Sequence, residues 1–303
     1  MRRPAPWRGP GELSRVAARR LQRQAPPTSA PAPPQGQAAP TAPPTATYQA
    51  PAADRFNYVF VMGSGGVFAL ADHFARAYYQ GHAIKQGTSL CGILEAIRGD
   101  VEFGTSGDPR RLIGQVVVIT HGLADGRVLF PLNDGDKDQW VRPEDVTTIL
   151  STDWITRTSL GCRFAARAVA GASDAATWVN VKGCNLGQNP AAVDALRGLF
   201  GGQATVTAPK ATVRIENLSY GAGVTGRRTA AEAISWMVRN LYLPPDAEAW
   251  APERREEFVK GLFVANAGPA GIPSDALVLP GGAKVPPSDP RYQENIAVSR
   301  PTP

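Results

Sequence analysis

The chain has 303 residues, 43% of them hydrophobic, which is enough apolar material for one large domain or two small ones. It has no run of 18 consecutive apolar residues, so the sequence predicts neither a membrane span nor a membrane partner. The net charge of +6 is confined to residues 1–52, which carry seven arginines and one acid. The remainder is neutral and offers no general basic face for a nucleic acid.

Residues 1–52 form a separate region by composition. They hold 12 of the 28 prolines, with alanine, glutamine and threonine between them. Such a segment cannot bury enough apolar surface to offset its ordering entropy, so we expect it to be disordered. It lacks the apolar core of a secretory signal. It is expected to be a solvated linker or, alternatively, a docking segment for a partner or a secretion machinery.

Strands and helices are expected to alternate from residue 56 to residue 208. The expected strands cover residues 56–62, 82–86, 115–120, 177–182 and 204–208. The expected helices cover residues 68–79, residues 88–97 with Thr88 as N-cap, a segment opened by Pro143, part of residues 151–172, and a segment opened by Asn189-Pro190. Short β-branched runs bounded by glycine are typical of buried parallel strands. The pattern predicts an α/β fold, a three-layer α/β/α sandwich with a mainly parallel sheet.

The last part of the chain changes character. Amphipathic helices are predicted at residues 227–241 and 252–263, and proline and glycine dominate from residue 268 onward, where we expect an irregular or frayed chain. The predicted organisation is therefore a disordered tail over residues 1–52, an α/β core over residues 53–215, and a helical and irregular extension over residues 216–303.

Two loops resemble binding motifs but lack their key residues. The glycine turn at residues 63–66 has Phe68 where a dinucleotide fingerprint needs glycine, and it lacks the Gly-Lys-Ser/Thr ending of a P-loop. Residues 133–137 open like a calcium loop but lack the spaced acids and the closing glutamate. The three histidines show no zinc-like spacing. We therefore assign no metal and no cofactor.

Two of the predicted strands end in residues that can do chemistry. The strand at residues 115–120 is followed by His121-Gly122, and the strand at residues 177–182 is followed by Gly183-Cys184. Open parallel sheets place their chemistry just beyond the carboxyl ends of the strands. A thiol needs a base to become a nucleophile, and imidazole serves near neutral pH.

The three cysteines differ in their sequence surroundings. They are too few and too scattered for a disulfide framework, which favours a reducing compartment and a cytoplasmic location, with non-classical export as the alternative. Cys91 lies on the apolar stripe of a predicted helix. Cys162 is next to Arg163 and near Arg167, which could lower the pKa of its thiol. Cys184 is the preferred nucleophile because only it ends a strand.

The order strand–His121–Gly122, then strand–Gly183–Cys184, resembles the caspase-like cysteine peptidases of clan CD. In that family one strand ends in His-Gly and a later strand ends in the nucleophilic cysteine. The residues around Cys184 depart from the caspase signature Gln-Ala-Cys-x-Gly, and His121 and Cys184 are 63 positions apart, against about 50 in caspases. This favours a bacterial CHAT-like branch. The resemblance covers about residues 56–210 and implies a caspase-haemoglobinase-like fold.

The resemblance also implies an activity, that of a cysteine endopeptidase acting on a protein or peptide. Cys184 would attack the carbonyl carbon and form a thioester, and His121 would move the proton. The backbone N–H groups of Gly122 and Cys184 would hold the oxyanion, with glycine at 122 and Gly183 allowing close approach. A thiolate paired with imidazole should also alkylate faster than an ordinary thiol. The substrate-binding residues and a third catalytic residue are unknown from sequence. The alternative is a catalytically inactive binding module whose basic tail docks a partner.

Overall fold

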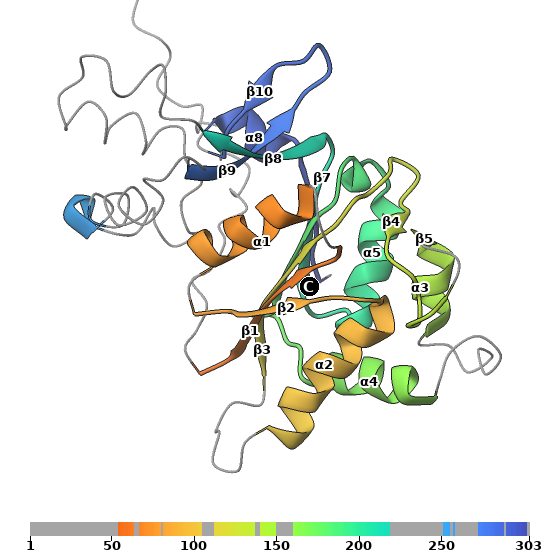
Figure 1. Ribbon diagram of the computed structural model, residues 1–303. Helices are drawn as coiled ribbons and strands as arrows, with labels where there is room; N and C mark the ends of the chain where they lie inside the picture. Colours follow the sequence, from red (N-terminus) through yellow and green to blue (C-terminus); the bar gives the residue numbers. More distant parts are fainter. Residues whose placement is uncertain are drawn as a thin grey trace, which may run out of the picture. The chain divides into compact units, whose positions relative to one another are not determined.

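The protein is an α/β protein built around a mainly parallel sheet of six strands (Figure 1). The computed structural model describes residues 54–63, 67–79, 81–104, 112–136, 140–149, 160–218, 251–254, 257, 272–287 and 289–301. The tail predicted over residues 1–52 and the helix predicted over residues 227–241 lie outside these residues. Only residues 252–254 and 257 of the helix predicted at 252–263 are described.

The strands of the main sheet follow the order β11-β7-β6-β3-β1-β2. The parallel strands are β1 (Phe56–Val61), β2 (Ala83–Gln86), β3 (Ile113–Ile119), β6 (Trp178–Lys182) and β7 (Thr205–Pro209). They confirm the five predicted strands. β11 (Ile296–Ser299) pairs antiparallel with β7 at one edge. Every residue of β1 and β3 is buried, because these strands are covered on both faces.

Helices pack on both faces of the main sheet (Figure 1). One face carries α1 (Val67–Tyr78), which places Ala71, Phe74, Ala75 and Tyr78 on one helical stripe against the strands. Burying a side chain such as Phe74 stabilises the fold by about 1.5–3 kcal/mol. The other face carries α2 (Leu90–Phe103), α4 (Leu160–Gly171) and α5 (Pro190–Leu199), and α3 (Pro143–Ile149) packs against α5.

The helix starts follow the local sequence closely. Pro190 occupies the first helical position of α5 as predicted. Asn189 caps this helix, because its side chain accepts a hydrogen bond from the backbone N–H of Ala192. The predicted cap of α2 was wrong by one residue. Ser89, not Thr88, accepts the hydrogen bond from the N–H of Gly92 at 2.9 Å. α2 also continues to Phe103, beyond the predicted end at residue 97.

A second sheet follows directly after β7. Its strands β8 (Thr212–Leu218), β9 (Ile272–Val278) and β10 (Lys284–Val285) are antiparallel, and we call it the small sheet. Only residues 210 and 211 separate β7 from β8, so the small sheet begins at the carboxyl edge of the main sheet. It lies beside α1 (Figure 1).

The expectation of an irregular chain after residue 268 was wrong. The described part of that region forms β9 and β10, then α8 (Pro290–Glu294), and finally β11, which returns to the main sheet. The boundary placed at residue 215 falls inside β8. Strand pairing continues across it, between β8 and β9 and between β11 and β7.

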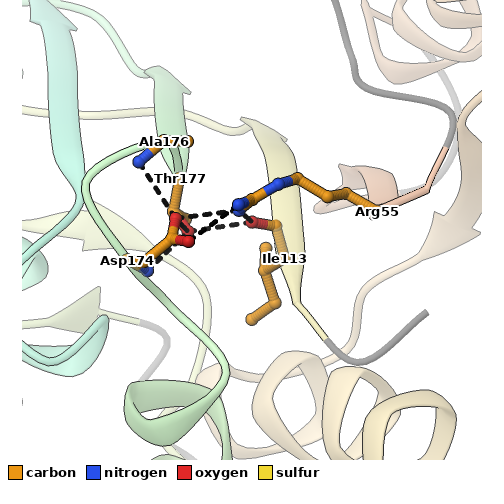
Figure 2. A network of polar contacts seen from close by, with 5 residues as sticks. All are labelled: Arg55, Ile113, Asp174, Ala176 and Thr177. Atoms are coloured by element: carbon orange, nitrogen blue, oxygen red, sulfur yellow. Dashed lines mark hydrogen bonds and ion pairs between the residues drawn. The ribbon is translucent and has the colours of Figure 1, made fainter.

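An ion pair ties the amino ends of the central strands together (Figure 2). The guanidinium of Arg55, just before β1, donates to both carboxylate oxygens of Asp174, just before β6, at 2.8 and 2.7 Å. Arg55 and the hydroxyl of Thr177 both donate to the carbonyl oxygen of Ile113 at the start of β3. Charge-assisted bonds of this bidentate kind fix geometry well. The opposite ends of β3 and β6 carry the candidate site.

Candidate catalytic site at the carboxyl ends of β3 and β6

The two strands that end in His121 and Cys184 are direct neighbours in the main sheet. β3 and β6 run parallel with Ile119 opposite Lys182, and the N–H of Thr120 donates to the carbonyl oxygen of Lys182 at 3.2 Å. His121 and Cys184 therefore leave the same edge of the sheet side by side. The chain turns back after His121, because the N–H of Leu129 donates to the carbonyl oxygen of His121 at 3.0 Å. It continues into β4 (Val128–Leu129), which pairs with β5 (Trp140–Val141).

The backbones of the two strand ends lie in close contact at Gly122. A Cβ atom on Gly122 would lie 2.9 Å from the carbonyl oxygen of Cys184 and 3.0 Å from the carbonyl carbon of Gly183. A Cβ atom on Gly183 would meet its nearest neighbour, a methyl group of Thr120, at 3.4 Å. The predicted need for close backbone approach therefore applies to Gly122, whereas Gly183 has room for a side chain.

The thiol of Cys184 is half-buried and faces the small sheet. Its Sγ atom donates a weak hydrogen bond to the carbonyl oxygen of Val213 in β8 at 3.5 Å. Burial raises the pKa of the Cys184 thiol, and nearby backbone groups offset this only in part. Asn185 then turns the chain in a left-handed conformation, φ 59°, which asparagine tolerates. Its N–H donates to the carbonyl oxygen of Ala211.

The imidazole of His121 faces a different neighbour. Its ring packs edge-on against the ring of Phe68 in α1, with the centroids 5.0 Å apart. Both His121 and Cys184 belong to the described residues, and no hydrogen bond joins the imidazole to the thiol. The fold thus brings the two backbones together, while each side chain contacts another element. A gap of this kind between base and nucleophile is common in unliganded enzymes.

The expectation of three free thiols was wrong. Cys91 in α2 and Cys162 in α4 form a disulfide, and Cys184 is the free cysteine. The spacing of the cysteines could not predict this disulfide, because 71 residues separate Cys91 from Cys162 and only the packing of α2 against α4 brings them together. Cys162 is therefore no reactive thiol beside Arg163 and Arg167. The inference of a reducing compartment rested on free thiols, and it loses that basis.

The other histidines and the rejected loops lie in different surroundings. His82, just before β2, hydrogen-bonds the side chain of Gln115, and His73 lies within α1. Residues 64–66 of the glycine turn lie outside the described part. In the loop at residues 133–137, Asp136 accepts hydrogen bonds from the backbone and side chain of Asn133, as a turn would. Within the described residues, no group of three or more histidine, cysteine or acidic side chains could hold a metal.

Three residues near the site were not predicted from the sequence. The ammonium of Lys182 lies 2.6 Å from a carboxylate oxygen of Asp275, and the hydroxyl of Tyr292 donates to the same oxygen at 3.0 Å. Lys182 ends β6 and Asp275 lies within β9, and both charged side chains are buried. A charged residue at such a position needs an opposite charge, and this signal could have linked the two segments.

No protein-family model, no curated protein and no solved structure matches this chain. Across the residues that are described, no helix is both long and apolar enough to cross a lipid bilayer.

Proposed function

We propose that this protein is a cysteine endopeptidase with a caspase-haemoglobinase-like fold, in which Cys184 is the nucleophile and His121 is the general base. One observation carries the proposal. The two residues that the resemblance pairs follow neighbouring parallel strands of one sheet, in register. Segments 63 positions apart in the sequence had many other possible arrangements. Support also comes from Gly122, whose lack of a side chain lets the two strand ends touch.

The chemistry requires the imidazole to accept the proton of the thiol. The Cys184 sulfur then forms a bond to the carbonyl carbon of a peptide, and the carbon–nitrogen bond breaks as His121 gives the proton to the leaving amine. Water hydrolyses the thioester and regenerates the thiol. The oxyanion forms next to the backbone of Gly122 and Cys184, where N–H donors would stabilise it. For this to happen, the thiol must exchange its contact with Val213 for one with His121.

Cleavage of a broad peptide library tests the proposal. Cys184→Ala should abolish turnover, and His121→Ala should reduce it by about 100- to 10,000-fold, the usual contribution of a general base. The double variant should be little worse than Cys184→Ala alone, because nucleophile and base act as a unit. His82→Gln is the matched control, because His82 precedes β2 at the amino ends of the strands and should leave cleavage unchanged.

A second candidate function is favoured by the hydrogen bond between Cys184 and Val213. If the thiol keeps this partner in every state, the fold serves as a binding module and Cys184 is a packing residue. The basic tail would then carry the function, by docking a partner as the sequence predicts. Absence of cleavage of every library peptide by the unmodified protein would favour this candidate over the peptidase.

A further inference from the structure

A buried ion pair joins the end of β6 to the small sheet. Lys182 is the last residue of β6, and its side chain is 4% exposed, while the side chain of its partner Asp275 in β9 is fully buried. The hydroxyl of Tyr292 in α8 donates to the carboxylate oxygen that Lys182 contacts. The ammonium also lies over the ring of Phe74 in α1, 5.6 Å from its centroid. One point of the main sheet is thus tied to β9, α8 and α1.

Stability alone does not account for an ion pair at this place. Removing two charges from water is expensive, and apolar side chains of similar volume often give an equally stable fold. An ion pair is more directional than an apolar contact, because its charge-assisted hydrogen bonds require a particular placement of the two segments. The pair between Lys182 and Asp275 therefore fixes where β9 lies relative to the end of β6.

The same small sheet holds the thiol of Cys184. Cys184 follows Lys182 by two residues, and its Sγ atom bonds the carbonyl oxygen of Val213 in β8. β8 and β9 are paired, with Ile215 opposite Asp275 and Val213 opposite Leu277. The strand that anchors Lys182 is therefore bonded to the strand that holds the thiol, so a shift of the small sheet would change both contacts.

We propose that Lys182, Asp275 and Tyr292 are positioning residues that keep the small sheet over Cys184 and hold its thiol on Val213, away from His121. The consequence for catalysis rests on the proposed function. The effect on the contacts of the Cys184 thiol does not depend on it. Loosening the ion pair frees Cys184 from β8. The freed thiol then becomes more accessible and ionises more easily, because less of its surroundings is apolar.

The rate constant for alkylation of Cys184 by iodoacetamide, measured on the full chain at pH 7.5 with peptide mapping, tests this. The double variant Lys182→Met/Asp275→Leu replaces the ion pair with apolar side chains, so it should fold with a melting temperature near that of the unmodified protein. Its Cys184 should alkylate about tenfold faster, because the thiol is then more accessible to the reagent and ionises more easily. Tyr292→Phe, which loses a single hydrogen bond, should give about a threefold increase.

Asp174→Asn is the matched control. It removes the ion pair between Asp174 and Arg55. Asp174 lies just before β6, at the end of that strand opposite to Lys182. This variant should lower the melting temperature and leave the alkylation rate within twofold. A folded double variant that alkylates at the unmodified rate would overturn the proposal. An equal increase in Asp174→Asn would also overturn it, since general loosening would then explain the effect. If the double variant does not fold, the result for Tyr292→Phe decides.

The two proposals fail separately in these experiments. Faster alkylation in the variants, together with no peptide cleavage by the unmodified protein, would leave the positioning role standing and remove the peptidase. Cleavage by the unmodified protein, together with unchanged alkylation in the variants, would support the peptidase and remove the positioning role.

Discussion

Gly122 and Gly183 face each other across the ends of β3 and β6, but only Gly122 lacks room for a methyl group. The nearest atoms to a Cβ at Gly122 are backbone atoms of Gly183 and Cys184, which cannot move without displacing the end of β6. At Gly183 the nearest atom is a methyl group at an ordinary contact distance. Neither glycine has a positive φ, so the difference is one of space and not of backbone conformation.

Gly122→Ala should therefore destabilise the fold by about 1–3 kcal/mol, the usual cost of overpacking. Gly183→Ala should stay within about 0.5 kcal/mol of the unmodified protein. Urea unfolding of the two variants measures both effects. A cost for Gly122→Ala as small as that for Gly183→Ala would show that the backbones of the two strand ends are not in close contact.

For single residues, the positions of the reactive side chains could be predicted from the sequence better than their partners could. The strand-end positions of His121 and Cys184 could be predicted, because each follows a short β-branched run bounded by glycine. The hydrogen bond to Val213 could not, because it depends on a strand that begins 28 residues after Cys184 and belongs to another sheet. The orientation of a thiol is decided by such non-local packing.

At the level of elements, the amino ends of β1, β3 and β6 depend on one carboxylate. Asp174 accepts two hydrogen bonds from Arg55 and one from the N–H of Ala176 (Figure 2). The hydrogen bonds from Arg55 are the main cause that lowers the pKa of Asp174, and partial burial opposes them. A lowered pKa in the folded state means that the folded chain binds a proton less readily than the unfolded chain. The stabilisation is therefore present above the pKa of an ordinary aspartate and is lost as the pH falls through the folded value.

The difference in melting temperature between the unmodified protein and Asp174→Asn should follow this rule. It should be constant from pH 7 to about pH 5 and shrink below about pH 4, where aspartate becomes protonated. Asp289→Asn is a suitable comparison, because Asp289 pairs with Arg291 on the surface beside α8 and ties no strands together. A difference for Asp174→Asn that is independent of pH would mean that the carboxylate acts through shape and not through charge.

Elements with strong local signals could be predicted, and elements made by distant pairing could not. β1, β3 and β6 are apolar runs with clear boundaries, and α3 and α5 open with proline. β9 contains Pro273 and Asp275, which interrupt the alternation that marks a strand. It exists because β8 and β10 supply hydrogen bonds on both sides. β11 likewise exists as an added edge of the main sheet, and its sequence alone gives little indication of that role.

For the molecule as a whole, the covalent link between α2 and α4 is the strongest constraint that the sequence concealed. Cys91 and Cys162 close a loop of about 70 residues that includes β3, β4, β5 and α3. In the chain-entropy account, closing a loop of this length restricts the unfolded chain by about 4 kcal/mol. Disulfides persist in oxidising compartments, so the link favours a protein that matures outside a reducing cytoplasm.

Thiol counting tests the link directly. The unfolded chain should show one titratable thiol without reductant and three after reduction, because only Cys184 is free. Reduction should lower the free energy of unfolding by up to about 4 kcal/mol. In the double variant Cys91→Ala/Cys162→Ala, the melting temperature should not respond to reductant, although Cys184 remains. Three thiols without reductant would show that α2 and α4 are held by packing alone, and a cytoplasmic location would regain its support.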